Sequence, residues 1–372
     1  MIQLKEIKTR KEIKQFVLFP FTLYKGNKYW VPPIINDEIA LFDSTKNPIF
    51  EIADAQLFVA IKNNKIVGRV AVIINNYEVD KQGIKKVRFG WFDVINDIEV
   101  TKLLIEKVRE IGKQHQLEYM EGPVGFNNLD KTGILTEGFD HIGTMITWYN
   151  HPYYKDHFEQ LGFTKEKEYL ENKFVYSNAN SKRYAKASRI IKKRYDLKPL
   201  NFTSTKQILP YVDEMFELFS KSYSKLSTYV PISDAQIQFF KKKYISFINP
   251  EYIKFVVDKE NKLIAFAIVM PSFAEALQKV KGKLFPFGIF HLLKARKHAK
   301  SITFYLIGVD PAYQNKGVTA VIFEEFHKEF TKNNVKECIR TPELVENMAI
   351  NKIWSSFNPW THKKRRTYRL DL

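Results

Sequence analysis

Hydrophobic and polar positions in residues 301–334 predict a buried strand, a turn and an amphipathic helix. The apolar run from Ile302 to Val309 has the length of a buried strand and stops at an Asp-Pro pair. Beyond the turn, apolar residues recur at helical spacing and predict one buried helix face: Val318, Val321, Ile322, Phe326 and Phe330. The turn leads directly into this helix, where free N–H groups and the helix dipole favour a bound anion. An ordinary strand–turn–helix without a ligand is the alternative.

The same patterning predicts alternating helices and strands in both halves of the chain. In the first half we expect helices at Arg10–Leu23, Pro33–Leu41, Val100–His115 and Tyr153–Leu161, and strands at Ala55–Ile61, Lys65–Ile74, Val87–Val94, Glu118–Gly122 and Met145–Tyr149. The turn Asn63-Asn64 joins the first two of these strands as a hairpin. In the second half, strands are expected at Ile253–Val257 and Lys262–Met270.

Parts of the two halves repeat each other. Sixteen residues from Phe58 align without a gap with sixteen residues from Phe255, and the pair Tyr149-Asn150 falls on Glu346-Asn347 at the same offset of 197. This predicts a duplicated domain, and a chain of 372 residues suits two domains of ordinary size. We expect domain one at 1–176, a basic linker and helix at 177–198, and domain two at 199–372.

Composition narrows the class of protein. The one cysteine, Cys338, excludes internal disulfides and fits a reducing compartment. No N-terminal signal pattern and no apolar run of about 20 residues is found, so we expect a cytoplasmic protein without a transmembrane segment. The eight histidines show no metal-ligand spacing, and no metal is expected.

The net charge of +18 comes entirely from the second half. Residues 1–180 hold 24 Lys and Arg against 24 Asp and Glu, whereas residues 181–372 hold 35 against 17. The excess lies in three clusters: Lys182–Lys198, Lys279–Lys300 and Lys363–Arg369. A phosphorylated cofactor, RNA or acidic lipid headgroups would be attracted to this half, although a solvated basic surface is the simpler interpretation.

Residues 273–300 form an insertion between two predicted strands. An apolar stretch, Leu284 to Leu293, runs into the basic stretch Lys294-Ala295-Arg296-Lys297. Such a segment could touch membrane headgroups or cover an apolar substrate. A helical pair packed on its own sheet or on domain one is the alternative that we favour.

Two motifs of the second half resemble the GNAT superfamily of acyl-CoA N-acyltransferases. The family's phosphate-binding signature is Gln or Arg, two residues, Gly, one residue, then Gly or Ala, after a strand ending in hydrophobic-x-Pro. Here the strand ends Val309-Asp310-Pro311, and the signature reads Gln314-Asn315-Lys316-Gly317-Val318-Thr319. The family's later motif is similar to Glu346-Asn347-Met348-Ala349.

The resemblance covers residues 200–372 well and residues 50–165 more weakly. It implies an α/β fold class with two tandem GNAT-like domains, each a mixed, mostly antiparallel central sheet flanked by helices. The segment Trp30-Val31-Pro32-Pro33 also resembles an uncharacterised bacterial double-domain group without an established substrate.

The resemblance also implies a cofactor site in domain two. Acetyl-CoA or another acyl-CoA would be the cosubstrate, and its acyl group would pass directly to a small-molecule or peptide amine. The pantetheine arm would lie along Ile307, Gly308 and Val309. The pyrophosphate would lie on the turn, at Gln314, Asn315, Lys316, Gly317, Val318 and Thr319, with Asn347 near the cofactor arm.

Several positions depart from the family pattern. Thr319 replaces the last small residue of the signature. The tyrosine that the family often uses as general acid is replaced by Trp354, and by Phe158 in domain one, neither of which releases a proton near neutral pH. The catalytic groups are therefore unknown, and the weak candidates are Tyr305 and Tyr313 as acids and Asp310 and Glu324 as bases. Packing, turn and solvated roles are commoner for all four.

Domain one departs further at the equivalent junction. It has no glycine turn, and Asp93, Asp97 and Glu99 stand where phosphates would bind, which predicts no cofactor there. The loop from Gly122 to Asp130 could form a wall of the substrate site, although an ordinary surface loop is the default.

Three functions from different classes follow. The leading one is a CoA-dependent N-acyltransferase, with acetyl transfer from acetyl-CoA as the favoured reaction. A second is a Fem-like aminoacyl-tRNA-dependent transferase, since those proteins are also tandem GNAT-like with basic surfaces; nucleic acid is thus an allowed but less favoured partner. The third is a catalytically silent CoA- or metabolite-binding protein. The acceptor, the acyl chain length and the oligomeric state cannot be derived from the residues.

Overall fold

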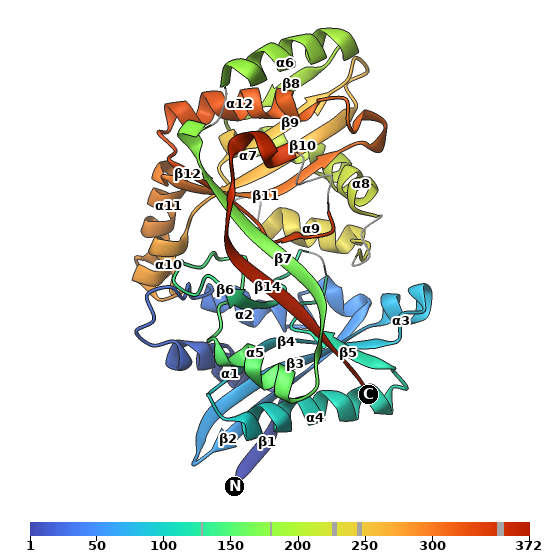
Figure 1. Ribbon diagram of the computed structural model, residues 1–372, viewed down its shortest axis with the longest axis vertical. Coiled ribbons are helices and arrows are strands. Elements are labelled where there is room, and N and C mark those ends of the chain that lie inside the picture. The colour runs from blue at the N-terminus through green and yellow to red at the C-terminus, as the bar shows by residue number, and fades with distance from the viewer. Residues whose placement is uncertain (128, 179–180, 225–228, 244–247, 348–352) are drawn as a thin grey trace. The chain divides into compact units, whose positions relative to one another are not determined.

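The computed structural model describes residues 1–372 except 128, 179–180, 225–228, 244–247 and 348–352 (Figure 1). The chain forms two compact units, each assembled from separate stretches. Unit 1 comprises Met1–Leu170, Ala274–Ile289 and His362–Leu372, and unit 2 comprises Glu171–Phe273 and Phe290–Thr361. The units are not two consecutive halves of the chain, because two later stretches pack in unit 1. The domain boundary expected at residue 176 stays a prediction.

Unit 1 contains the strand order β1-β2-β3-β4-β5-β14 of a mixed sheet. All neighbours are antiparallel except β4 and β5, which are parallel. The strands are β1 (Ile2–Ile7), β2 (Ala53–Lys62), β3 (Lys65–Asn75), β4 (Lys86–Val94), β5 (Tyr119–Gly122) and β14 (Trp360–Asp371), and β6 (Ile134–Glu137) pairs with β14. Asn63 and Asn64 have φ of 52° and 58°, which confirms the two-residue hairpin turn between β2 and β3.

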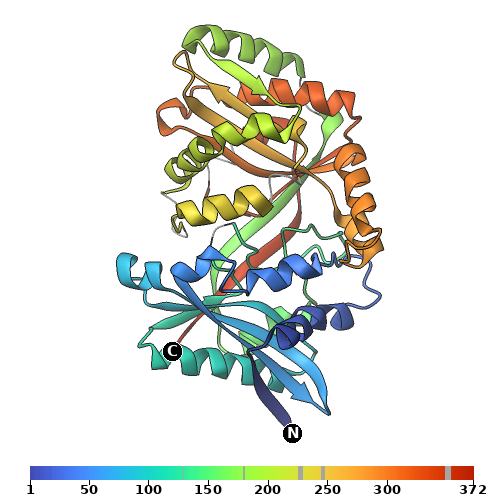
Figure 2. The same ribbon diagram turned by 180° about the vertical axis from the view of Figure 1, so that it is seen from behind.

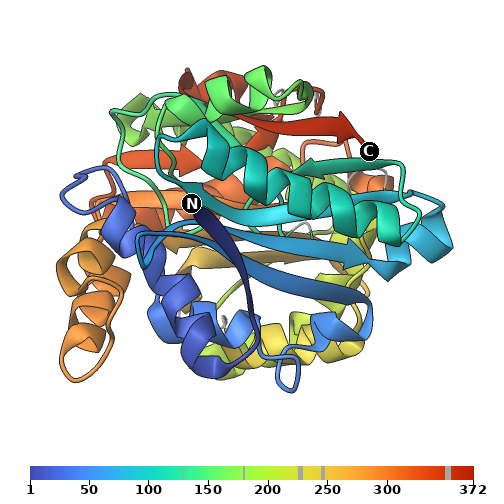
Figure 3. The ribbon, with the colours of Figure 1, turned by 90° about the horizontal axis from the view of Figure 1, so that it is seen from below.

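Helices cover both faces of the unit 1 sheet, as Figure 3 shows for α4 on one face and α1 and α2 on the other. Each face buries its own apolar cluster, because successive residues of the central strands point to opposite sides. The helices of this unit are α1 (Arg10–Leu23), α2 (Ile35–Leu41), α3 (Asn76–Gln82), α4 (Ile98–Gln114), α5 (Tyr153–Gln160) and α10 (Ala274–Val280).

Unit 2 repeats this plan with the strand order β7-β12-β11-β10-β9-β8, in which only β11 and β12 are parallel. Its strands are β7 (Thr164–Val175), β8 (Lys198–Asn201), β9 (Ile253–Val257), β10 (Leu263–Pro271), β11 (Ser301–Val309), β12 (Glu337–Arg340) and the short β13 (Glu343–Leu344), which pairs with β7. Its helices are α6 (Ser181–Tyr195), α7 (Thr205–Ile208), α8 (Val212–Tyr223), α9 (Asp234–Lys243), α11 (Gly288–His298) and α12 (Thr319–Lys332). α12 faces the viewer in Figure 1, and α8 lies on the opposite face, towards the viewer in Figure 2.

The predicted amphipathic helix is confirmed as α12. All five residues of its expected apolar face are buried in the core of unit 2. Short 3₁₀ helices join the longer elements at Pro48–Glu51, Tyr176–Asn178, Leu209–Tyr211, Pro250–Tyr252, Pro311–Tyr313 and Ser355–Phe357.

The two units exchange their last strands. β14 follows the chain of unit 2, yet it pairs with β5 of unit 1, where Tyr368 lies opposite Gly122. β7 follows the chain of unit 1, yet its end pairs with β12 of unit 2, where Val175 lies opposite Glu337. Unit 1 thus pairs β5 with a strand from the second half of the chain, and unit 2 pairs β12 with a strand from the first half.

One predicted strand is wrong. Residues 145–149 form a short turn followed by irregular chain, and the hydroxyl groups of Thr144 and Thr147 are hydrogen-bonded at 3.0 Å. The next residue, Asn150, binds the backbone of Leu135 through its side chain, as donor to the carbonyl and acceptor from the N–H. Tyr149 of this segment is buried, and the strand that lies beside β5 is β14.

Candidate functional site

Strand β11 is paired on both sides only over its first half. It pairs with β10 along its length, but its partner β12 runs beside it only from Ser301 to Phe304. The register with β10 skips Tyr305, because Ile268 faces Leu306 and Val269 faces Phe304. This bulge marks the point where β11 and β12 separate. From Leu306 to Val309, no strand of the described residues pairs with this side of β11, and we call this stretch the open edge.

The open edge presents backbone groups at alternate residues. The N–H of Asp310 donates to the carbonyl of Ile264 at 2.8 Å, so residues 306, 308 and 310 point their polar groups towards β10. Ile307 and Val309 therefore point theirs away from β10. Their carbonyls accept from the hydroxyls of Tyr223, at 3.1 Å, and Ser222, at 3.2 Å. Within the described residues we find no acceptor for their N–H groups, which can bind amide or thioester carbonyls.

The turn after β11 is exposed and shaped by two residues with positive φ. Asn315 has φ of 59° and Gly317 φ of 80°. Residues 314–317 are exposed, whereas Val318 is buried and anchors the start of α12. In the part of the chain that the structure describes, the N–H groups of Asn315, Gly317 and Thr319 have no acceptor. Three free donors at a helix N-terminus suit a phosphate group.

Helix α6 lies beside this turn. A Cβ on Gly317 would lie 3.3 Å from Cδ1 of Ile191, so a side chain at this position would press on α6. Lys316 Nζ lies 5.5 Å from the ring centroid of Tyr195 and 5.3 Å from that of Tyr313. The cation is thus held near the turn by aromatic faces.

The expected third basic cluster does not form a basic surface. Lys363 and Arg365 of β14 are buried in unit 1, where Lys363 Nζ donates to the carbonyl of Ile142 at 2.6 Å. Lys364 pairs with Glu137, and Arg366 pairs with Glu168. Sequence counting cannot detect this, because burial in the exchanged strand is a tertiary effect.

Comparisons with known proteins identify the fold. No protein-family model matches the sequence. The structure is similar to that of a tandem GNAT protein from the clavulanic acid biosynthesis pathway, with a TM-score of 0.60 and 8% sequence identity. The superposition covers 100% of this chain and 98% of that one. The structure is also similar to that of a GCN5-related N-acetyltransferase from Sphaerobacter thermophilus, with a TM-score of 0.52 and 7% sequence identity, over 100% of this chain and 95% of that one. The chain has the tandem GNAT fold.

Two curated relatives are similar in sequence along most of the chain. Protein YghO of Escherichia coli is 25% identical over 380 residues, which cover 98% of this chain and 94% of the relative. A bacterial ceramide synthase of Caulobacter vibrioides is 23% identical over 316 residues, which cover 83% and 80%.

The structure assigns other tasks to most of the candidate catalytic residues. Asp310 accepts the N–H of Ala312 at 2.9 Å and thereby caps the short helix Pro311–Tyr313. Tyr313 lies in the turn, where burial raises its pKa. Burial also raises the pKa of Glu324, but hydrogen bonds from Ser188 and Lys192 outweigh it and lower the pKa overall. Glu324 is thus an ion-paired anion rather than a free base.

Trp354 takes no part in proton transfer in this arrangement. It is buried, and its ring centroid lies 4.7 Å from that of Phe304, in the core of unit 2. Asn347 lies in a turn after β13, where its N–H donates to the carbonyl of Leu344 at 3.0 Å. The rest of the later motif, residues 348–352, lies outside the described residues, so the expected role of Asn347 stays a prediction.

Tyr223 at the open edge is a residue that no sequence pattern indicates. Its ring stacks on Phe219 of the same helix, with centroids 4.3 Å apart, and its hydroxyl donates to Ile307. Burial raises the pKa of Tyr223 to about 12, so the group is protonated at neutral pH. Only the packing of α8 on the sheet brings it there.

In unit 1 of this GNAT fold, the equivalent edge is filled by side chains. Val94 occupies the position of Val309, because each faces the matching residue of the preceding strand. The hydroxyl of Tyr154 lies 2.8 Å from the N–H of Val94 and accepts it, while the hydroxyl of Tyr153 donates to its carbonyl at 2.7 Å. A cofactor amide that used the N–H of Val94 would have to displace Tyr154. The expected absence of a cofactor in domain one stays a prediction.

The expected position of Asp93 is wrong. Asp93 is buried within β4, where it pairs with Arg69 at 2.7 Å and accepts the hydroxyl of Tyr24 at 2.6 Å. Burial raises its pKa. The helix N-terminus is instead capped by Asp97, which accepts the N–H of Glu99 at 3.1 Å.

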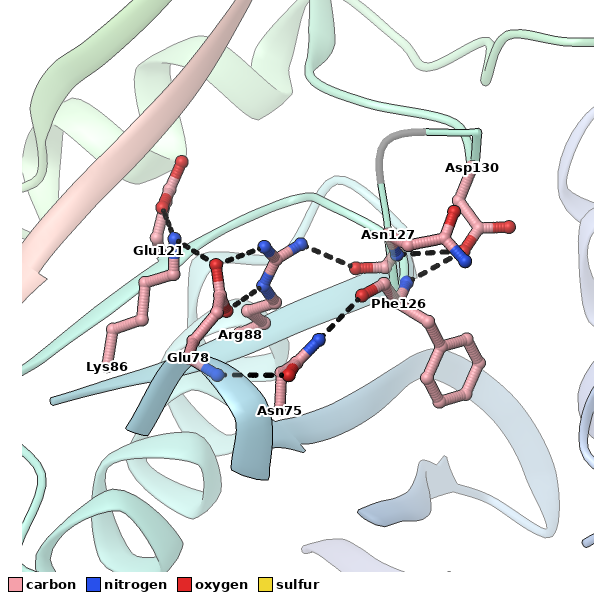
Figure 4. A network of polar contacts seen from close by, with 9 residues as sticks. Asn75, Glu78, Lys86, Arg88, Glu121, Phe126, Asn127 and Asp130 are labelled. Atoms are coloured by element: carbon pink, nitrogen blue, oxygen red, sulfur yellow. Dashed lines mark hydrogen bonds and ion pairs between the residues drawn. The ribbon is translucent and has the colours of Figure 1, made fainter. Parts of the chain in front are cut away.

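The loop from Gly122 to Asp130 is tied into a buried network of unit 1 (Figure 4). Arg88 binds Glu78 at 2.7 Å and donates to the carbonyl of Gly125 at 3.0 Å. The Asp130 carboxylate accepts the N–H groups of Phe126 and Asn127, at 2.9 and 3.1 Å. The prediction of an ordinary surface loop is therefore wrong, because these hydrogen bonds hold the backbone of the loop inside unit 1.

Within the described residues, no group of His, Cys, Asp and Glu side chains is arranged to hold a metal ion. Over the same residues, every helix is too short or too polar to cross a bilayer. Cys338 is buried in β12, and burial raises the pKa of its thiol well above the usual range.

Proposed function

We propose that this protein is an acyl-CoA-dependent N-acyltransferase and that unit 2 binds the acyl-CoA. The observation that carries the proposal is the alignment of two sets of free N–H groups. One set, on Ile307 and Val309, lines the open edge of β11; the other lies on the turn that follows the same strand. An extended chain of amides ending in a pyrophosphate has the acceptors to match both sets.

The residues of unit 2 would bind and orient rather than react covalently. The thioester of the bound acyl-CoA supplies the activated acyl group. The N–H groups of the open edge would hold the pantetheine amides and polarise the thioester carbonyl for attack by an amine. Tyr223 places a proton donor on the same edge, and we propose it as the group that protonates the departing thiolate.

The proposal extends to the acyl group and the amine. Acetyl-CoA is the donor that the sequence favours. One relative is named bacterial ceramide synthase, and a ceramide is an amide of a long-chain fatty acid and a long-chain amino alcohol. We therefore propose a long-chain acyl-CoA as a second donor and such an amino alcohol as its acceptor. Both donor classes share the CoA end, for which the turn is proposed.

Binding is tested first, by the melting temperature of the protein with increasing CoA, acetyl-CoA or palmitoyl-CoA. Stabilisation should grow with ligand concentration in the wild type. Gly317→Glu brings a negative charge to the turn and a side chain against Ile191 of α6, and it should abolish this stabilisation. The matched control is Gly26→Glu, because Gly26 also has positive φ, 82°, and a Cβ placed there would have no atom within 4 Å.

Transfer is tested by release of free CoA thiol in the presence of a panel of amines that includes sphinganine. Thiol release with both an amine and an acyl-CoA supports the enzyme. CoA binding without release for any amine would favour the silent binding protein, for which the buried Trp354 is the supporting observation. No stabilisation by any CoA compound would refute both.

A further inference from the structure

The turn before α11 and the first residues of α11 expose three phenylalanine rings. Phe285 is 77% exposed, Phe287 72% and Phe290 64%, and Leu293 one helical turn later is 44% exposed. Rings of this size are normally buried, and a contiguous group of them on a surface marks a contact site.

The chain beneath these rings is held in place. The N–H of Ile289 donates to the carbonyl of Leu284 at 2.8 Å, and Gly288 is so close to the carbonyl of Lys283 that a side chain there would clash. Leu292, on the inner face of α11, is buried. The aromatic side chains are therefore displayed by an ordered turn rather than by a loose loop.

The charged residues along this part of the chain have one sign. Residues 276–309 contain seven Lys and Arg and no Asp or Glu. On α11, the exposed residues Phe290, Leu293, Lys294 and Lys297 share one face, since they follow each other at intervals of three and four. This face is apolar at the start of the helix and basic towards its end.

We infer that this segment, Lys279 to His298, binds the surface of an anionic membrane, with the phenylalanine rings among the lipid chains and the lysines at the headgroups. Apolar tips flanked by Lys match both layers of such a surface. A second copy of this chain is a poorer partner, because it would bring the same positive charges together. The inference concerns this surface alone and does not depend on acyl transfer.

Vesicle binding of the full chain, without any CoA compound, tests the inference. Wild-type protein should co-sediment with vesicles of phosphatidylglycerol and phosphatidylcholine and not with pure phosphatidylcholine. The triple variant Phe285→Ser, Phe287→Ser, Phe290→Ser should bind at least about a hundredfold more weakly. Lys294→Gln and Lys297→Gln should each weaken binding about fivefold.

A matched control comes from the other basic helix. Ile190 of α6 is 54% exposed among basic residues, and Ile190→Ser should leave vesicle binding unchanged. Insertion is read directly from Phe287→Cys carrying an environment-sensitive dye, because the native Cys338 is buried. The dye emission should shift to the blue with anionic vesicles only.

Equal binding to neutral vesicles, or unchanged binding by the triple variant, would overturn the inference. So would sedimentation showing a wild-type dimer that the triple variant fails to form, since the rings would then be a contact between copies. Binding to vesicles without binding to CoA would support the membrane surface and refute the proposed enzyme. Binding to CoA without binding to vesicles would support the enzyme and refute the membrane surface.

Discussion

Replacing Asp130 by Asn should remove a pH-dependent loss of stability from unit 1. Asp130 is half-buried, and the desolvation of its carboxyl, more than any neighbour, raises its pKa to about 6. Two backbone N–H groups lower the pKa without outweighing burial. The amide oxygen of Asn can accept the same two hydrogen bonds, but the amide does not titrate.

The magnitude follows from the shift. An aspartate in the unfolded chain has a pKa of about 3.9, so the shift to about 6 corresponds to about 3 kcal/mol. Because the native pKa is the higher one, the native state holds the proton more tightly. The stabilisation is fully present below pH of about 4 and is lost as the pH rises through about 6. Above that range, Asp130→Asn should be more stable than the wild type by up to about 3 kcal/mol.

Urea unfolding of both proteins at a series of pH values measures the difference in unfolding free energy. Hydrogen exchange of peptides from residues 122–133 assigns the change to the loop. Asp140→Asn is the control for the substitution itself, because Asp140 is exposed. Parallel pH curves for the wild type and Asp130→Asn between pH of about 4 and 7 would refute the reasoning.

Three further predictions concern the open edge, the turn and the exchanged strand. Tyr223→Phe should lower kcat at least about tenfold while leaving the melting-temperature response to CoA intact, because only the proton donor is removed; equal kcat would exclude Tyr223 as the acid. Gly317→Ala and Gly26→Ala should each lower the free energy of unfolding by about 1 to 2 kcal/mol, because both glycines have positive φ. Only Gly317→Ala should also weaken CoA binding, as measured by a thermal-shift titration. Tyr368→Ala should cost about 3 kcal/mol, seen as faster hydrogen exchange in α4 and α5 of unit 1, because the buried ring packs 5.4 Å from Phe158; unchanged exchange there would contradict the strand exchange.

Local patterns in the sequence predict the helices, strands and turns that depend only on residues close together in the chain. The apolar face of α12, the hairpin at Asn63-Asn64 and the strand–turn–helix around Gly317 each depend on residues close together in the chain. Two short motifs accordingly suffice to indicate the tandem GNAT fold. The roles proposed for the turn residues stay predictions.

Positions set by distant packing cannot be predicted in this way. The pattern puts Asp93 at a helix N-terminus, but Arg69 and Tyr24 hold it in the core. Tyr154 blocks the edge of unit 1, and Tyr223 reaches the edge of unit 2, through contacts with strands far away in sequence. The strand expected at 145–149 is wrong for the same reason, because the strand that completes the sheet comes from the other half of the chain.

The exchange of strands sets an order for folding during synthesis. Unit 1 lacks a second sheet neighbour for β5 until the ribosome has made β14, roughly 250 residues later, and such distant pairing is slow. Until then the unpaired edge of β5 is a template for other strands. Expression of residues 1–176 alone should therefore give aggregates, and a separately supplied peptide of residues 360–372 should rescue them.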